Sequence, residues 1–164
     1  MVRPWTNADA GSLHRHANNR NVSMHLRDRF PFPYELENAT TFLGWLVNQP
    51  SPTVWAIVVD GEAVGGIGIE LHSDVERVSA EIGYWLGEAV WGRGIATEAL
   101  RGVTAEAFAR YELTRIYAVP FADHQASIRV LEKAGYVREG VMRQSAIKDG
   151  RIRDQALYAT YKPL

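Results

Sequence analysis

The chain has 164 residues, of which 46% are hydrophobic and 23% charged, and its formal net charge is −1. This length suits one domain over residues 1–164, and the near-neutral charge argues against a nucleic-acid partner. The absence of cysteine excludes disulfides and thiolate metal sites. Because the chain has neither a signal-like start nor about 18 consecutive apolar residues, we expect a cytoplasmic protein with no membrane partner.

Two helices are predicted in the first third of the chain. The first covers residues 8–19 and takes Thr6 or Asn7 as its N-cap, because short polar side chains satisfy the first helical amides. The second covers residues 39–47, with Asn38 as its cap. The second helix is expected to stop before Pro50.

The segment between these helices is predicted to be irregular over residues 27–34. It contains two prolines separated by one residue, and each removes a backbone donor and fixes φ. Its aromatic part, residues 30–34, either lines a binding site or packs on the core, and the sequence leaves both readings open. We expect Trp5 and Trp45 in the core.

Three consecutive antiparallel strands are predicted in the middle of the chain. Residues 54–59 and 63–71 are apolar, and Asp60-Gly61 between them is a strong hairpin signal. Residues 79–86 alternate between two faces, as a strand does. A helix then begins near Gly94. Its predicted buried face consists of Ala96, Ala99, Leu100, Val103 and Ala107.

The remaining elements are a strand, a helix and two strands. A short strand is expected within residues 114–120, and a helix over residues 125–134 is predicted to have Asp123 as its N-cap and Gly135 just past its end.

The last two strands are predicted around residues 137–143 and 156–161, joined through Asp149-Gly150. This order of elements indicates an α/β (α+β layered) fold.

The segment Trp91–Ala96 is typical of an anion-binding loop. It joins a strand to a helix N-terminus, where amides lack internal partners and the helix dipole is positive. Gly92 and Gly94 let a phosphate approach the backbone, and Arg93 can add a charged contact. A Walker loop is excluded by the missing Gly-Lys-Ser/Thr, and a dinucleotide fingerprint is disfavoured because Thr97 replaces its third glycine.

Residues 80–86 and 91–99 together resemble the central motif of the GNAT N-acetyltransferases, and residues 126–136 resemble their second helix and its exit. The resemblance is strongest over residues 79–143 and is closest to the RimJ/RimL-type branch. It implies a mixed, mostly antiparallel sheet flanked by helices, with splayed central strands. It also implies that acetyl-CoA is the acetyl donor, that CoA is the product, and that an amine attacks the thioester directly.

The same resemblance implies which residues bind the donor. The pantetheine would pair with the strand end, and the pyrophosphate would lie on the loop and the first helical turn. The implied residues are Trp85, Leu86, Gly87, Trp91, Gly92, Arg93, Gly94, Ile95, Ala96, Thr97, His124, Ser127 and Lys133. Three positions depart from the family pattern. Trp91 replaces a usual Gln or Arg, His124 replaces a frequent Asn, and Leu131 stands where many relatives place a tyrosine general acid.

Glu81 and Ser127 are the candidate catalytic residues. An amine must be neutral to attack, and Glu81 is the best candidate for its base, directly or through water; the alternative is a structural ion pair or a solvated strand face. Ser127 either donates to the leaving thiolate or binds pantetheine, or it bonds to its own helix backbone. Lys133 either reaches a phosphate of the donor or complements the helix C-terminus.

The leading hypothesis is therefore an N-acetyltransferase acting on a primary amine, either a peptide N-terminus or a small molecule. The alternative is a non-catalytic acyl-CoA-binding or sensing module, and a nicotinamide-dependent oxidoreductase is disfavoured. No metal site is expected, because the five histidines lack metal-ligand spacing. A homodimer stays open.

Overall fold

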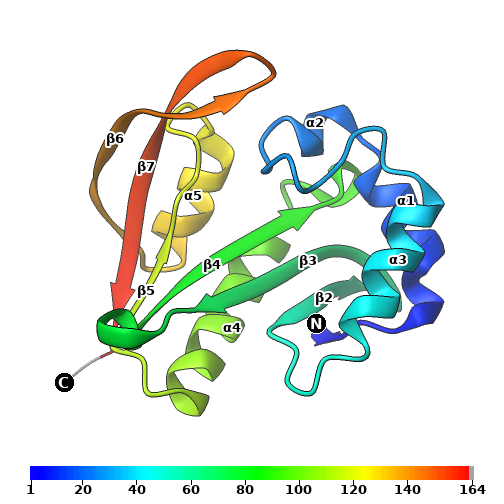
Figure 1. Cartoon of the computed structure of the whole chain (residues 1–164), viewed down its shortest axis with the longest axis horizontal. Helices are drawn as coiled ribbons and strands as arrows, with labels where there is room; N and C mark the ends of the chain where they lie inside the picture. Colours follow the sequence, from blue (N-terminus) through cyan, green and yellow to red (C-terminus); the bar gives the residue numbers. More distant parts are fainter. Residues whose placement is uncertain (163–164) are drawn as a thin grey trace. The chain divides into compact units, whose positions relative to one another are not determined.

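The computed structural model describes residues 1–162 as a seven-stranded sheet flanked by helices, with the strand order β1-β2-β3-β4-β5-β7-β6 (Figure 1). The strands are β1 (Val2–Pro4), β2 (Val54–Val59), β3 (Glu62–Leu71), β4 (Ser79–Leu86), β5 (Arg115–Ala118), β6 (Val137–Lys148) and β7 (Arg151–Tyr161). The α-helices are α1 (Ala10–Ala17), α2 (Arg20–Ser23), α3 (Leu36–Leu46), α4 (Ile95–Arg110) and α5 (Gln125–Lys133), and the 3-10 helices are η1 (Asn7–Asp9), η2 (Asp74–Glu76) and η3 (Glu88–Val90). The predicted mixed α/β class is confirmed.

The chain forms two compact units. The first unit is Met1–Gly68 with Tyr84–Ile95, and the second is Ile69–Gly83 with the described chain from Ala96 onward. Strands β3 and β4 each contribute residues to both units. The single acetyltransferase domain expected over residues 1–164 stays a prediction. None of the helices within residues 1–162 combines the length and the apolar character of a membrane span.

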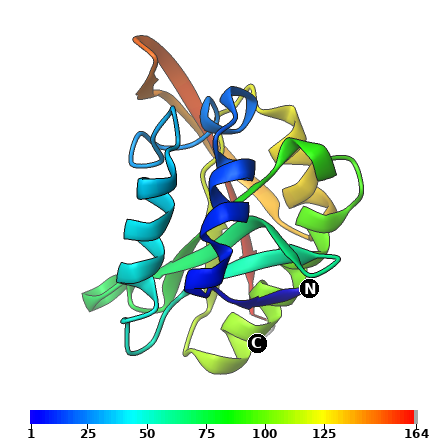
Figure 2. The same ribbon diagram turned by 90° about the vertical axis from the view of Figure 1, so that its right-hand side faces the viewer.

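The core of the first unit lies between its two long helices and its strands. Helices α1 and α3 lie side by side (Figure 2), and the buried residues that pack together come from both helices, from β2 and β3, and from the segments next to them. These residues are Trp5, Leu13, Ala17, Tyr34, Ala39, Leu43, Leu46, Ala56, Val58 and Ala63. The hairpin predicted at Asp60-Gly61 is confirmed, and both residues have positive φ, 49° and 85°, as a type I′ turn requires.

The two tryptophans predicted in the core have different outcomes. Trp5 is buried, as expected, but the prediction for Trp45 is wrong because its side chain is 57% exposed. The buried face of α3 consists of Ala39, Leu43 and Leu46, which follow helical spacing. Residue 45 falls outside that face, and Trp45 packs instead beside Phe42, with 6.2 Å between the ring centroids.

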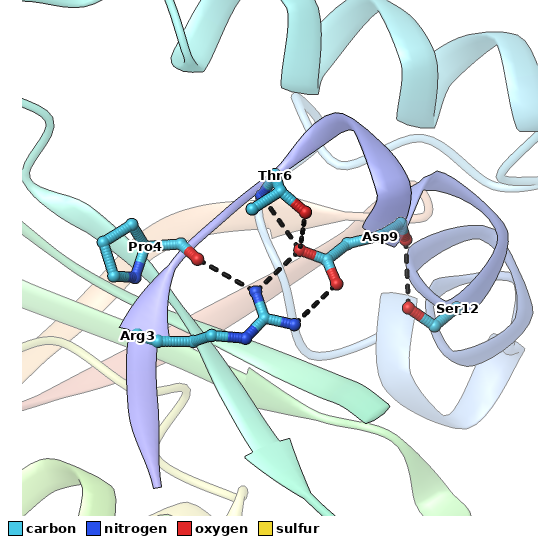
Figure 3. Close-up of polar contacts among 5 residues, drawn as sticks. All are labelled: Arg3, Pro4, Thr6, Asp9 and Ser12. Carbon is cyan, nitrogen blue, oxygen red and sulfur yellow. Dashed lines mark hydrogen bonds and ion pairs between the residues drawn. The ribbon is translucent and has the colours of Figure 1, made fainter. Parts of the chain in front are cut away.

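An ion pair fixes the start of the first helical segment (Figure 3). Arg3 donates two hydrogen bonds to the Asp9 carboxylate, at 2.7 and 2.8 Å, and the backbone and hydroxyl of Thr6 donate two more. Thr6 is the N-cap of η1, which confirms one of the two predicted caps. The Arg3 hydrogen bonds lower the pKa of the Asp9 carboxyl despite its burial, with a further contribution from Thr6.

Two other predicted caps are wrong. Helix α3 begins earlier than expected, with Glu35 as its N-cap, and Asn38 accepts a hydrogen bond of 2.7 Å from the Glu35 amide. Asn38 is therefore the third helical residue of a capping box. At α5 the N-cap is His124. The carboxylate of Asp123 instead forms an ion pair with Arg153. The side chain that was expected to cap the helix therefore makes a tertiary contact.

The second unit contains the parallel pair of strands and the C-terminal hairpin. Residues 79–81 of β4 pair with residues 115–117 of β5, and β7 lies between β5 and β6. The last two strands extend further than predicted, up to the Asp149-Gly150 turn, where both residues have positive φ. The register shifts between Met142 and Ala146, and this bulge disrupts the alternation on which a strand prediction depends.

Candidate active site

The loop between β4 and α4 folds back on the end of its own strand. After β4 ends, η3 covers residues 88–90 and Trp91 is extended. The indole Nε1 of Trp91 donates a 2.7 Å hydrogen bond to the carbonyl of Leu86. This bond ties the middle of the loop to the end of β4, although Trp91 itself is 45% exposed. The residue that departs from the family pattern at the loop start therefore has a structural partner.

The glycines of this loop leave its backbone open. Gly92 and Gly94 have φ of 74° and 77°, and a Cβ added at either would meet nothing within 4 Å. Both residues and Arg93 are exposed. Helix α4 begins at the next residue and runs for 16 residues, and the first amides of a helix lack internal partners and lie at the positive end of its dipole. The segment can therefore accept an anion on its backbone.

A glutamate anchors the loop to an earlier part of the first unit. Glu88 accepts hydrogen bonds from the side-chain amides of Asn19, at 2.7 Å, and Asn21, at 3.0 and 3.1 Å. These three residues were not predicted from the sequence. Asn21 and Asn19 are 67 and 69 positions from Glu88 in the chain. The only signal in the sequence was Glu88 itself, an isolated polar residue at the start of η3.

The end of β4 is also fixed by close packing. The Gly87 amide donates a 2.7 Å hydrogen bond to the carbonyl of Val64. A Cβ at Gly87 would lie 2.5 Å from Nδ1 of His16. The other ring nitrogen of His16 is 2.9 Å from Glu62, so the ring is held in place. A glycine is therefore needed at position 87 because a side chain would clash with His16. Its backbone conformation, with φ of −60°, does not require glycine.

Trp85 and the aromatic loop belong to the packed interior of the first unit. Phe30 lies 5.3 Å from Trp85 and 5.0 Å from Tyr34, measured between ring centroids. Tyr34 is buried, and burial raises its pKa to about 12. Phe32 is 46% exposed. These contacts favour the packing alternative for Phe30 and Tyr34, whereas Phe32 is exposed.

In the second unit, α5 carries three of the predicted site residues. His124 and Ser127 are half-buried at the start of the helix, and Lys133 is exposed at its end. The carbonyl of Lys133 accepts a 2.5 Å hydrogen bond from Arg101. Leu131, where many relatives have a tyrosine, is fully buried. This position therefore serves the core of the unit.

Glu81 is half-buried on β4 and lies beside Tyr117 of β5 in the parallel register. Burial raises the pKa of Tyr117, and the negative charge of Glu81 raises it further. Ala96 and Thr97, in the first turn of α4, are half-buried and buried.

A family comparison is consistent with the geometry of this loop. Residues 1–137 match the model of the family described as the acetyltransferase (GNAT) domain. This chain belongs to the GNAT family. In this GNAT chain the match includes β4, the whole loop, α4 and α5, which are the elements that carry every predicted site residue. The roles of these residues stay predictions.

This GNAT protein is similar to two curated relatives and to one solved structure. YoaA of Bacillus subtilis (strain 168), named an uncharacterized N-acetyltransferase, is 38% identical over 102 residues, which are 62% of this chain and 57% of YoaA. The ribosomal-protein-serine acetyltransferase of Escherichia coli (strain K12) is 29% identical over 106 residues, 65% of this chain and 59% of that protein. The aligned part of the chain thus spans less than two thirds of the length of these relatives.

The solved structure is that of RimJ from Mycobacterium smegmatis in complex with a CoA-disulfide. It is 27% identical, with a TM-score of 0.86, and the match covers 98% of this chain and 80% of RimJ. The resemblance to the RimJ/RimL-type branch is confirmed. Within residues 1–162 of this GNAT protein, no three His, Asp or Glu residues are grouped so that they could hold a metal ion.

Proposed function

We propose that the chain is an acetyl-CoA-dependent N-acetyltransferase that acts on a primary amine. The observation that carries this proposal is the open backbone of the Gly92–Gly94 loop ahead of a 16-residue helix. Such a segment suits a pyrophosphate, because backbone amides and the helix dipole meet it without side-chain obstruction. The solved structure of the RimJ relative is a complex with a CoA-disulfide, which supports CoA as the nucleotide.

The donor would rest on the strand end and the loop. The backbone of Leu86 and Gly87 would meet the pantetheine, and Gly92, Arg93 and Gly94 the pyrophosphate. The bond from Trp91 to Leu86 and the amides of Asn19 and Asn21 on Glu88 hold this backbone before the donor arrives. A preformed site loses less conformational entropy on binding.

The reaction would then need few side chains. The amine nitrogen forms a bond to the thioester carbonyl carbon, the C–S bond breaks, and the nitrogen gives up a proton. Holding amine and thioester together makes this step effectively unimolecular. Glu81 would take the proton of the amine, directly or through water, and Ser127 would donate to the departing thiolate.

For the acceptor amine, the proposal names only its chemical class. The Escherichia coli relative is named for a ribosomal-protein serine, which favours the α-amine of a protein N-terminus over a small-molecule amine. An α-amine, with an ordinary pKa of about 8, also needs less help from a base than a lysine at about 10.4. Thiol release from acetyl-CoA, measured with a panel of N-terminal peptides, polyamines and aminoglycosides, tests this choice.

Two measurements distinguish the proposed enzyme from the alternative, a non-catalytic acyl-CoA-binding module. Calorimetry should detect CoA binding; no heat at millimolar CoA would contradict both readings. Glu81→Gln should lower kcat at least tenfold with unchanged affinity for CoA. The charge-matched control is Glu106→Gln, at an exposed position on α4, which should leave kcat unaltered. Donor binding without thiol release from any acceptor in the wild type would establish the rival instead.

A further inference from the structure

A histidine in the last turn of α1 is held by a glutamate at the first position of β3. The ring nitrogen Nε2 of His16 lies 2.9 Å from Oε1 of Glu62, and Arg15 donates a 2.5 Å hydrogen bond to the same oxygen. The His16 side chain is only 12% exposed. The His16 ring is therefore both enclosed and anchored at the end of its helix.

This contact determines which ring nitrogen of His16 carries the proton. An ionised carboxylate only accepts hydrogen bonds, so Nε2 is the donor to Glu62. In a neutral ring the other nitrogen, Nδ1, then has a lone pair and no proton. Within residues 1–162, no group donates to Nδ1 of His16. Nor is Nδ1 among the polar atoms in this part of the chain that are closed off from solvent without a partner. Nδ1 is thus an unused acceptor that solvent reaches.

Nδ1 of His16 lies against the end of β4. A Cβ added at Gly87 would be 2.5 Å from Nδ1, and a carbon–carbon single bond is about 1.5 Å long, so Nδ1 is within about 4 Å of the Gly87 Cα. Gly87 is itself buried, and the His16 ring covers the side on which a side chain would stand. A ligand that approaches this side of the strand end therefore meets His16.

The backbone groups at the end of β4 already have partners. The amide of Gly87 donates to the carbonyl of Val64 at 2.7 Å, and the carbonyl of Gly87 accepts from the amide of Val90 at 3.2 Å. The carbonyl of Leu86 accepts from the indole of Trp91 at 2.7 Å. A ligand N–H that arrives here finds in the imidazole Nδ1 an acceptor that no protein group occupies. A donor that loses water on binding needs such an acceptor.

The pantetheine arm of coenzyme A contains secondary amides, and each carries one N–H donor. We propose that Nδ1 of His16 accepts a hydrogen bond from an amide N–H of this arm, so that His16 is a binding residue for the acetyl donor. Glu62 positions the ring and keeps the proton on Nε2. This inference rests on the proposed function, which brings the pantetheine to Leu86 and Gly87.

Two substitutions of His16 separate the ligand contact from the contact with Glu62. The amide of Asn branches at the same carbon as Nδ1, so His16→Asn keeps an acceptor beside Gly87 but no longer reaches Glu62. The amide of Gln lies one carbon further out, so His16→Gln keeps a donor to Glu62 and removes the acceptor. By calorimetry, His16→Gln should weaken CoA binding about two- to tenfold, the factor for one hydrogen bond. His16→Asn should bind CoA nearly as tightly as the wild type. Equal losses in the two variants, or a larger loss in His16→Asn, would overturn the proposal.

A ligand without the pantetheine arm shows where the affinity is lost. Adenosine 3′,5′-bisphosphate keeps the nucleotide part of CoA and lacks the arm. His16→Gln should leave the affinity for this nucleotide unchanged, because the Gly92–Gly94 loop is intact. If both ligands bound more weakly by the same factor, the substitution would be acting on the loop, which contradicts a pantetheine contact.

A ¹⁵N NMR measurement of the His16 ring separates this inference from the proposed function. At about pH 8, where an ordinary imidazole is neutral, we expect the donor-free protein to carry the ring proton on Nε2. Addition of CoA should then shift the Nδ1 signal as this nitrogen accepts a hydrogen bond. A proton on Nδ1 in the donor-free protein, or an Nδ1 signal that bound CoA leaves in place, refutes the inference while the enzyme proposal stands. No binding of CoA at all would contradict both.

The matched control is the other histidine on the buried side of the same helix turn. Nδ1 of His14 is 2.7 Å from the carbonyl of Tyr34, so this nitrogen already has a partner in the protein. His14→Gln should leave CoA affinity unchanged. A loss as large as that in His16→Gln would mean that the calorimetry reports a general disturbance of α1, and the proposal would fall.

Discussion

Replacing Gly87 by alanine tests how the end of β4 is held. The backbone there, with φ of −60° and ψ of 140°, accommodates any L-residue, so the only perturbation is the added methyl group. That methyl carbon would lie 2.5 Å from Nδ1 and 3.0 Å from Cβ and Cγ of His16. The His16 ring can move away only by giving up its 2.9 Å contact with Glu62.

The magnitude follows from these contacts. Overpacking by one methyl group costs about 1–3 kcal/mol, and the lost hydrogen bond adds about 1 kcal/mol. The smaller conformational entropy of the unfolded alanine chain offsets about 0.4–1 kcal/mol. We expect Gly87→Ala to lower the free energy of unfolding by about 1–3 kcal/mol in urea denaturation, and calorimetry should show weaker CoA binding.

Two further variants isolate the clash. Gly83→Ala is the control, because a Cβ at this β4 position meets nothing within 4 Å, and it should not destabilise the protein. Adding His16→Ala to Gly87→Ala removes the atoms in the way, so the double variant should be no less stable than His16→Ala alone. If Gly87→Ala matched the wild type in both stability and CoA affinity, the packing argument would be refuted.

Three other predictions concern the loop and the first helix. Gly94→Val forces a β-branched residue to a φ of 77° and should weaken CoA binding at least tenfold by calorimetry; equal affinity would contradict the backbone cradle. Glu88→Ala should lower CoA affinity several-fold with a stability change within about 0.5 kcal/mol, since it releases Asn19 and Asn21 at the surface; unchanged affinity would show that the loop needs no anchor. Asp9→Asn should cost about 1–3 kcal/mol at pH 7. Because the folded-state pKa of Asp9 is lowered, this contribution is present above the ordinary carboxyl pKa and is lost as pH falls through the folded pKa. Acid unfolding curves of the two proteins should therefore converge, and a constant gap would contradict the ion-pair account.

The local features of the fold were predictable because they depend on neighbouring residues. The Asp60-Gly61 turn and the glycine at the end of α5 are examples: Gly135 has a φ of 92°, and the amides of Gly135 and Tyr136 bond back to the last turn. Asp123 was mispredicted because Arg153, far along the chain, competes for its carboxylate. The exposure of Trp45 likewise depends on which face of α3 is buried.

The candidate site also contains features that depend on neighbouring residues and features that depend on distant ones. Its loop is one continuous segment, and the positions of Gly92 and Gly94 could be inferred from spacing and helix physics. The residues that hold the loop could not be inferred, because His16 and Asn19 are far from the loop in the sequence.

The place of β7 between β5 and β6 has a consequence for the order in which the chain can fold during synthesis. β5 ends at Ala118, but its antiparallel partner begins only at Arg151. Until β7 has left the ribosome, that edge of β5 and the whole of β6 lack their partner, although β6 has already been made. Such non-local pairing is slow and leaves strand edges exposed. The second unit is thus the part of the nascent protein that most needs protection from aggregation.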